Sequence, residues 1–310
     1  MSRLYVTNTN SDSVSVIDPA TAAVARTIGV GVSPFRITPN GDGSRVYVVN
    51  VGINATVPDP EKTRVPGTLS VIDTATDAVV ATVVVGRGPR EAALSPDGSR
   101  VYVINQDSAD VTVVDVATHT VVATVPVGKG PFGVAVSPDG RSVYVANFLS
   151  DSVSVIDAAT DTVRATVAVA KGPFGVAVTP DGKGVYVANF DSDDVAVIDT
   201  DTNVARSEFR VGSKPIAVVI TGNKAYVTNQ DSGTVTVIDV ARHEVETTVV
   251  VGELPQGAAV DPDGRSLYVA NFGSNSVSVI DIATNAVSTT IRPVNQPTGI
   301  GVVRSPAQRD

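Results

Sequence analysis

A five-residue phrase that occurs seven times constrains this chain more than any other feature of its sequence. The phrase is an aliphatic residue, tyrosine, valine, a variable residue and asparagine, and it contains every tyrosine of the chain: Tyr5, Tyr47, Tyr102, Tyr144, Tyr186, Tyr226 and Tyr268. Successive tyrosines are 42, 55, 42, 42, 40 and 42 residues apart. A regular period of this length, built from short β-type segments, is typical of a β-propeller. Seven copies therefore predict seven blades, numbered here in the order of their tyrosines.

Each repeat divides into four short segments that favour β-strands. In the fourth repeat the predicted strands are Gly133–Ser137, Ser142–Asn147, Ser152–Asp157 and Thr162–Val169. The first two are joined by Pro138–Arg141, whose Asp-Gly pair suits a tight hairpin turn. Valine, threonine and tyrosine dominate the strands, as pleated sheets prefer. We expect small residues in the innermost strand of each blade, because seven such strands converge on the central channel.

The two ends of the sequence predict how the ring closes. The sequence starts with a second strand, Leu4–Asn8, and ends with a segment that aligns with first strands, Pro297–Val303. We therefore predict an all-β, seven-bladed β-propeller with four antiparallel strands per blade, in which the C-terminal strand completes the N-terminal blade. Residues 1–310 are expected to form one domain, with an inserted loop at 51–67 in blade 2 and a tail at 304–310.

Composition narrows the classes of partner. The net charge of −9 argues against general nucleic-acid binding, and no apolar run is long enough for membrane insertion. The absence of cysteine excludes disulfides and thiolate chemistry. The first predicted strand begins too early for a signal peptide, so we expect either a cytoplasmic protein or one whose leader has been removed. We expect a monomer.

Four phrases together resemble a known repeat family. They are Tyr-Val-x-Asn, Ser-Pro-Asp-Gly, Val-Ile-Asp-x-Ala-Thr and Val-Gly-x-Gly-Pro. They are similar to the YVTN-type repeat family of seven-bladed propellers, over essentially the whole chain. The resemblance implies a propeller fold and a binding or surface-associated role. Its more distant seven-bladed relatives include lactonases, lyases and haem-binding domains.

Function is sought where the repeats differ. In each repeat a proline opens the blade, and the two residues after it are mostly apolar or small. Only blades 2 and 3 place charged residues there. The pairs, in ring order, are Phe35-Arg36, Arg90-Glu91, Phe132-Gly133, Phe174-Gly175, Ile216-Ala217, Gln256-Gly257 and Thr298-Gly299. The 51–67 insertion, an excess of 13 residues, belongs to the same sector. A guanidinium at the channel mouth would bind a carboxylate or phosphate. The alternative is an Arg–Glu ion pair that closes the channel.

Aromatic and amide side chains extend this candidate site. Six of the seven phenylalanines fall in loops of the face that we call the top, which carries the loops between second and third strands. They predict either a hydrophobic plug or an aromatic floor for a ligand. The candidate ligand-binding residues are Arg36, Arg90, Glu91, Phe35, Asn50, Gln106, Phe132, Phe174 and Gln256.

Several kinds of catalytic chemistry are missing. His119 and His243 fall in turns of the opposite face, and no cluster has metal-ligand spacing, so we expect no metal and no cofactor. The recurring aspartates of the turns are expected to be structural. If the protein is an enzyme, Glu91 is the candidate acid–base group, with Arg36 and Arg90 binding substrate. Two neighbouring arginines should lower the pKa of Glu91, which suits a base poorly unless burial opposes it.

Three functional hypotheses follow. The leading one is a binding propeller that recognises a small anionic molecule or a protein segment at the channel mouth of blades 2 and 3. The second is a metal-independent enzyme of lactonase, lyase or cyclase type at the same mouth. The third is a structural interaction scaffold, which a mouth filled by phenylalanines, with no cavity, would favour.

Overall fold

The computed structural model describes residues 2–52, 66–292 and 294–304. Most of the predicted insertion at 51–67, and residues 305–310 of the predicted tail, lie outside the described residues. The rest of the chain is almost entirely β-structure, with two single-turn 3₁₀ helices, η1 (Thr9–Ser11) and η2 (Phe148–Ser150).

Each blade contains an innermost, a second, a third and an outer strand. The innermost strands are β28 (Pro297–Arg304), β4 (Pro34–Pro39), β8 (Pro89–Leu94), β12 (Pro131–Val136), β16 (Pro173–Val178), β20 (Pro215–Thr221) and β24 (Pro255–Val260). The second strands are β1 (Ser2–Asn8), β5 (Arg45–Asn50), β9 (Arg100–Asn105), β13 (Ser142–Asn147), β17 (Gly184–Asn189), β21 (Lys224–Asn229) and β25 (Ser266–Asn271).

The remaining strands complete the blades toward the rim. The third strands are β2 (Ser13–Asp18), β6 (Thr68–Asp73), β10 (Asp110–Asp115), β14 (Ser152–Asp157), β18 (Asp194–Asp199), β22 (Thr234–Asp239) and β26 (Ser276–Asp281). The outer strands are β3 (Ala23–Gly29), β7 (Ala78–Val84), β11 (Thr120–Pro126), β15 (Thr162–Ala168), β19 (Val204–Arg210), β23 (Glu244–Val250) and β27 (Ala286–Ile291).

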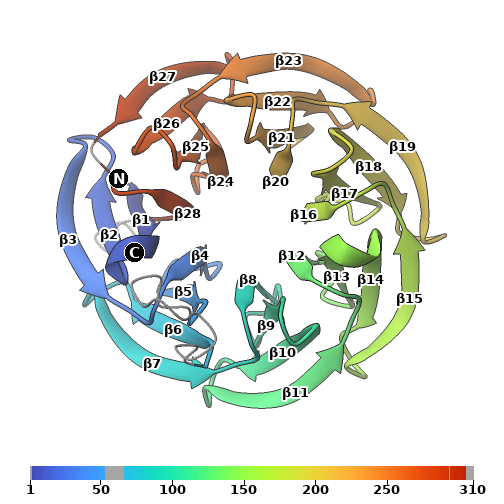
Figure 1. Cartoon of the computed structure of the whole chain (residues 1–310). Coiled ribbons are helices and arrows are strands. Elements are labelled where there is room, and N and C mark those ends of the chain that lie inside the picture. The colour runs from blue at the N-terminus through green and yellow to red at the C-terminus, as the bar shows by residue number, and fades with distance from the viewer. Residues whose placement is uncertain (1, 53–65, 293, 305–310) are drawn as a thin grey trace, which may run out of the picture.

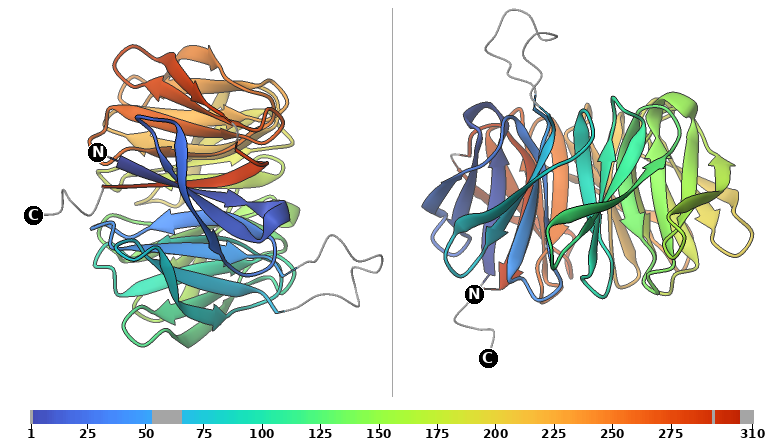
Figure 2. Two further views of the ribbon diagram at one scale, coloured as in Figure 1. Left: turned by 90° about the vertical axis from the view of Figure 1, so that its left-hand side faces the viewer. Right: turned by 90° about the horizontal axis from the view of Figure 1, so that it is seen from below.

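The described strands form seven four-stranded antiparallel sheets around a central axis, which confirms the predicted fold class (Figure 1). Blade 1 has the order β28-β1-β2-β3, so the last strand pairs with the first and closes the ring. The register joins Ser2 to Arg304 and Tyr5 to Gly301. Seen from the side, the ring is a short, thick disc (Figure 2).

The hydrophobic core lies between neighbouring blades. One cluster combines Tyr102 and Val113 of blade 3 with Val143 and Ile156 of blade 4, and each of the other clusters joins two adjacent blades in the same way. Both faces of each blade are therefore apolar, which explains why the second strands have apolar residues at consecutive positions. No helix in the described part of the chain is long and apolar enough to cross a membrane.

The recurring turn aspartates are structural, as predicted. Asp139 accepts hydrogen bonds from the hydroxyl of Ser137 at 2.6 Å and from the backbone N–H of Arg141 at 3.0 Å. Asp157 accepts the backbone N–H groups of Ala159 and Thr160, each at 3.0 Å. These bonds favour the charged carboxylate and lower the pKa of both aspartates.

In blades 4 and 5 the innermost strand lies so close to that of the next blade that glycine is required. A Cβ atom on Gly133 would lie 2.2 Å from the carbonyl oxygen of Phe174 in the next blade, and one on Gly175 would lie 2.3 Å from that of Ile216. Arg36 and Glu91 occupy the equivalent positions of blades 2 and 3. Two large charged side chains therefore stand where most blades have glycine.

Candidate functional site

A cavity of about 380 Å³ lies on the axis of the ring, within the range of volumes usual for ligand sites. All seven innermost strands contribute to its wall. Most lining side chains are aliphatic, among them Ile37, Val134, Val218 and Ile300. The polar side chains in the wall are Arg36, Thr38 and Glu91, contributed by the neighbouring strands β4 and β8. The cavity is thus asymmetric in charge, with one polar sector in blades 2 and 3.

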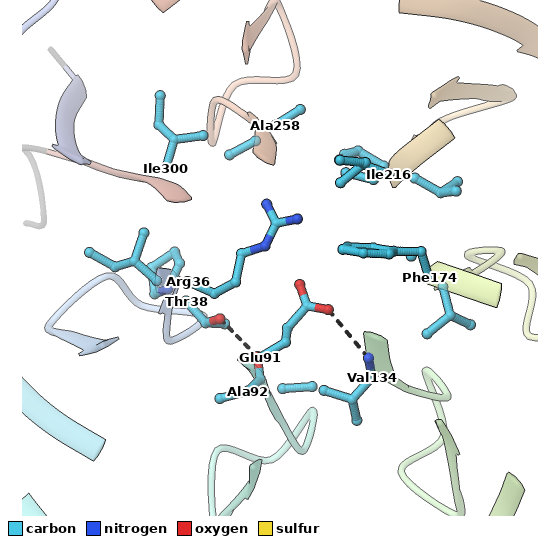
Figure 3. A pocket seen from close by; sticks show the side chains of 18 of the residues that line it. Arg36, Thr38, Glu91, Ala92, Val134, Phe174, Ile216, Ala258 and Ile300 are labelled. Carbon is cyan, nitrogen blue, oxygen red and sulfur yellow. Dashed lines mark hydrogen bonds between the residues drawn. The ribbon is translucent and has the colours of Figure 1, made fainter. Parts of the chain in front are cut away.

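Backbone irregularities position these two charges. In blade 2 the register between β4 and β5 shifts between Pro34 and Ile37, and in blade 3 that between β8 and β9 shifts between Pro89 and Glu91. Because a bulge reorients the side chains of the strand that contains it, the residues after the opening proline can point into the channel. Figure 3 shows the side chains of Arg36 and Glu91 pointing into the centre of the ring, opposite the ring of Phe174.

The guanidinium of Arg36 is deeply buried. Arg36 is 8% exposed, its Nη1 donates to the carbonyl of Thr298 at 3.2 Å, and its Cζ lies 5.6 Å from the ring centre of Phe35. The same Nη1 occupies the space beside Gly257, where a Cβ atom would lie only 2.3 Å away. Burial lowers the pKa of Arg36 although Glu91 opposes that effect. An arginine still keeps its charge at neutral pH, so the cavity contains a desolvated cation.

Glu91 is the second charge in the cavity. Its Oε2 accepts a hydrogen bond from the backbone N–H of Val134 in blade 4 at 3.4 Å. Burial raises the pKa of Glu91, outweighing the opposing effects of Arg36 and of this hydrogen bond. Arg36 thus acts on this pKa in the expected direction, but burial opposes it and the net shift is upward. The reason is that removing the carboxylate from water disfavours its charge more than one guanidinium at a distance stabilises it.

Arg36 and Glu91 interact through space but are not in contact. Neither takes part in an ion pair within 4.0 Å in the described part of the chain. Arg36 uses only one of its five N–H donors in a described hydrogen bond. Both groups can therefore form hydrogen bonds to a molecule in the cavity.

Arg90 lies above the cavity wall, in a stack of rings. Its Cζ is 5.5 Å from the ring centre of Phe35 and 5.2 Å from that of Phe132, and its Nε donates to Oε1 of Gln106 at 2.6 Å. Cation–π contacts on both sides hold the guanidinium at the channel mouth. Arg90 and Gln106 thus link the loops of blades 2, 3 and 4 and do not line the cavity.

The phenylalanines of blades 4 and 5 continue this stack. The ring centres of Phe132 and Phe174 are 4.1 Å apart, and Phe148 and Phe190 lie within 6.1 Å of Phe174. The rings pack on one another, as expected for a hydrophobic plug, but a cavity lies beneath them. Phe174 belongs to both the cluster and the cavity wall.

The remaining predicted site residues have structural contacts. Asn50 is fully buried, and its amide donates to the hydroxyls of Thr68 at 3.0 Å and Ser70 at 2.9 Å. Gln256 is 8% exposed, and its backbone carbonyl accepts the hydroxyl of Thr228 at 2.8 Å. Of the nine predicted side chains, the structure brings Arg36, Glu91 and Phe174 together in the cavity wall.

Sequence reasoning missed the aliphatic wall below Arg36 and Glu91. These residues lie further along each innermost strand, as Ile37 and Val134 do, and Thr38 donates to the carbonyl of Ala92 at 2.8 Å. The repeat alignment contained their positions, but their similarity from blade to blade gave no reason to select them. The described residues contain no group of three or more His, Asp or Glu side chains that could hold a metal.

Comparison with protein families gives one partial match. A model of the seven-bladed β-propeller lactonase family matches residues 82–206, from the end of β7 into β19. This segment includes Glu91 but not Arg36. Among curated proteins, none matches this chain in sequence.

Solved structures share the fold at low sequence identity. A functionally unknown protein from Desulfotomaculum acetoxidans superposes with a TM-score of 0.83 at 16% identity, covering 97% of this chain and 99% of that chain. The periplasmic gluconolactonase of Pseudomonas aeruginosa gives 0.79 at 22% identity, covering 98% and 99%. Hydrazine synthase of Kuenenia stuttgartiensis gives 0.73 at 22% identity, covering 88% and 96%. At these identities the likeness establishes the propeller fold.

The raised pKa of Glu91 predicts a dependence of stability on pH. Because its pKa in the folded protein exceeds the unfolded value of 4.5, ionisation costs folding free energy. The stabilisation of the folded protein by protonated Glu91 is fully present below pH 4.5. It is lost as the pH rises through the pKa of Glu91 in the folded protein. Glu91→Gln is therefore expected to melt at a higher temperature than wild type at neutral pH, with the difference vanishing in acid. Thermal melts of both proteins across this range test it, and equal stability at neutral pH would contradict it.

Proposed function

We propose that the protein hydrolyses a lactone in the axial cavity, with Glu91 as general base and Arg36 as the group that stabilises the developing negative charge. The observation that carries this proposal is the pairing of a carboxylate of raised pKa with a buried cation in one cavity. The match to the lactonase family model over residues 82–206 supports it, and so does the likeness to a gluconolactonase.

The two side chains suit ester hydrolysis by water. Glu91 accepts a proton from a water molecule, whose oxygen attacks the lactone carbonyl carbon. The negative charge that develops on the carbonyl oxygen is stabilised by the unused N–H groups of Arg36. When the ring C–O bond breaks, the proton held by Glu91 passes to the leaving alkoxide, and the product is a hydroxy acid. A raised pKa brings Glu91 closer to the value at which a general base is most effective near neutral pH.

The chain is further proposed to be a YVTN-type repeat protein. The seven tyrosine–valine–x–asparagine phrases and the regular turns support this assignment. It is compatible with an enzymatic role, because repeats define the ring, whereas chemistry depends on residues that differ between blades.

A panel of unsubstituted, alkyl and sugar lactones tests the proposal. Release of hydroxy acid should follow enzyme concentration for at least one lactone, and Arg36→Gln should lower kcat about 10²–10³-fold, the loss typical for removal of one oxyanion donor. Arg87→Gln, which changes an exposed arginine outside the cavity, serves as the matched control. Melting temperatures of all three proteins separate catalytic loss from unfolding. No hydrolysis across the panel, or equal rates for Arg36→Gln and wild type, would refute the proposal.

Anion binding without catalysis is the second candidate. The unused donors of the buried Arg36 favour it, since a desolvated guanidinium attracts a carboxylate or phosphate strongly. A ligand that stabilises wild type and Glu91→Gln equally, is not turned over, and loses its effect in Arg36→Gln would favour this function over hydrolysis.

A further inference from the structure

At several junctions between neighbouring blades, a basic side chain of one blade binds a turn of the next. We call this contact a clip; it lies on the bottom face, opposite to the top loops. In blade 1, Arg3 lies two residues before Tyr5 and reaches the turn between the third and outer strands of blade 2. Its Nη1 donates to the carbonyl of Thr74 at 2.9 Å, and its other Nη pairs with Asp77. The hydroxyl of Tyr5 donates to the same Asp77 at 2.6 Å. The clip thus consists of a cation, a tyrosine and an acceptor in the next blade.

The same clip recurs at other junctions. In blade 3, Arg100 donates to the carbonyl of Ala158 at 3.0 Å and pairs with Asp161 of blade 4 at 3.0 Å. In blade 6, Lys224 donates to Asn285 of blade 7 at 3.2 Å. Asp77, Asp161 and Asn285 hold the same turn position, with φ between 52° and 53°. These three junctions therefore show that the space between two blades can hold the basic end of an arginine or lysine side chain.

The junction between blades 5 and 6 lacks both ends of the clip. Gly184 stands where Arg3 and Arg100 stand in their blades, and His243 stands where the acceptor is expected. Tyr186 is 1% exposed, and its hydroxyl has no hydrogen-bond partner among the residues that the structure describes. A buried hydroxyl without a partner costs free energy, and Tyr5 avoids that cost by donating to Asp77, whereas Tyr47 of blade 2 shares it with Tyr186.

A cavity of about 490 Å³ occupies this junction. Tyr186 and His243 line it together with two carboxylates, Asp181 and Asp199, and two cations, Lys183 and Arg206. Asp181 binds the hydroxyl of Thr179 through Oδ1, and its Oδ2 accepts no hydrogen bond from the described residues. Burial, together with Asp239 and Asp181, raises the pKa of Tyr186 to about 12, as expected for a phenol in a negative environment. The cavity therefore offers carboxylate acceptors to a hydrogen-bond donor, beside two cations of its own.

Two of the side chains that line this cavity, Tyr186 and His243, each stack on the ring of Phe209. The rings of Tyr186 and Phe209 lie 6.2 Å apart at 8°, and those of Phe209 and His243 lie 6.5 Å apart at 5°. A planar cation stacks well on aromatic faces, as Arg3 does over Tyr5 at 5.5 Å in blade 1.

The cations that this region already contains do not complete the clip. The Nη2 of Arg206 lies 3.6 Å from Asp199, and its side chain is 58% exposed. In blade 4 the equivalent Arg164 reaches Ser142 at 2.8 Å, the residue that replaces the clip arginine there. In blade 5 no side chain extends from Gly184 to meet Arg206, and the hydroxyl of Tyr186 stays unpaired.

We propose that the cavity between blades 5 and 6 binds a guanidinium group from outside the chain, in the place where this blade lacks its own arginine. The guanidinium would donate to the hydroxyl oxygen of Tyr186 and to the carboxylates of Asp181 and Asp199. Its source is either an arginine side chain of another protein or a free guanidinium compound. This site lies on the bottom face and is independent of hydrolysis in the axial cavity.

Titration with two guanidinium probes and neutral counterparts tests the proposal. N-acetyl-arginine methylamide represents a protein side chain, agmatine represents a free compound, and N-acetyl-citrulline methylamide has the same shape without the charge. We expect a Kd on the order of 1 mM for a guanidinium probe, measured by NMR shifts, and at least tenfold weaker binding of the citrulline compound. The tighter guanidinium probe indicates the source. Equal binding of the charged and neutral compounds, or no binding, would overturn the proposal.

Two variants locate the site. Gly184→Arg restores the side chain of the sister blades and should reduce binding at least tenfold; a Cβ at this position would lie 3.3 Å from Thr179, a contact that a small shift relieves. If that variant does not fold, Arg100→Gly provides the converse test, because it opens the equivalent space beside Asp161 and should add a second site. Unchanged binding in Gly184→Arg, or no added site in Arg100→Gly, would contradict the assignment.

Discussion

Replacing Glu91 by glutamine is expected to lower kcat for lactone hydrolysis about 10²–10⁴-fold, the contribution usual for a positioned general base. Glutamine keeps the size of the side chain but cannot accept the proton of the attacking water. Because burial raises the pKa of Glu91, this carboxylate is a better base near neutral pH than an exposed one. The loss should appear in kcat more than in KM, since the carboxylate acts on the water and not on the bound ring.

The dependence of the proposed hydrolysis on pH, measured with the wild-type protein, is a second test of Glu91. Activity should fall as pH drops through the raised pKa of Glu91, which lies above 4.5, because the protonated acid is no longer a base. Glu253→Gln, a change in an exposed loop, is the matched control and should leave both rate and profile unchanged. A Glu91→Gln variant that folds and retains wild-type kcat would eliminate Glu91 as the base.

Gly133→Ala is expected to destabilise the protein by about 3 kcal/mol, near the upper end of the usual range for overpacking. The added methyl carbon would lie 2.2 Å from the backbone oxygen of Phe174 and 3.2 Å from the Cα of Gly175. Backbone atoms of the next blade cannot move aside as a flexible side chain can, so the two innermost strands must separate. The effect should reach the axial cavity, because Val134 and Phe174 line it.

Chemical denaturation of three proteins tests this prediction. Gly41→Ala is the matched control: nothing lies within 4 Å of a Cβ there, so its stability should change by no more than about 0.5 kcal/mol. A Gly133→Ala variant as stable as Gly41→Ala would show that the ring can expand at the channel, and that the small residues of the innermost strands are not required by packing.

The fold was predictable from sequence because each blade repeats the same local pattern. Tyr102 and Tyr144 mark equivalent second strands, so the register of one repeat fixes that of the others. The departures from the repeat likewise identified Arg36 and Glu91. A position that differs from six equivalents is informative without any knowledge of the structure.

The environment of those residues was not predictable in the same way. The sign of the pKa shift of Glu91 depends on how much water surrounds the carboxylate and on how far Arg36 lies from it. Neither the hydration of the carboxylate nor its distance from Arg36 can be derived from the spacing of residues in the sequence. Arg90 follows a proline just as Phe35 and Phe132 do, but only the structure shows its guanidinium held between those two rings. The sequence thus indicated blades 2 and 3. Only the structure shows that Arg36 and Glu91 line the cavity, whereas Arg90 lies at the channel mouth.

Ring closure has a consequence for how the molecule forms. The pairing of Ser2 with Arg304 joins segments from opposite ends of the described chain, so blade 1 cannot be completed until all other blades have been synthesised. Until then β1 exposes a free strand edge, and β24 lacks β28, the innermost strand of the adjacent blade. Contacts so distant in sequence form slowly, and unpaired edges are the places where chains associate wrongly. The period between synthesis of β1 and arrival of β28 is therefore when this protein is most exposed to misassembly.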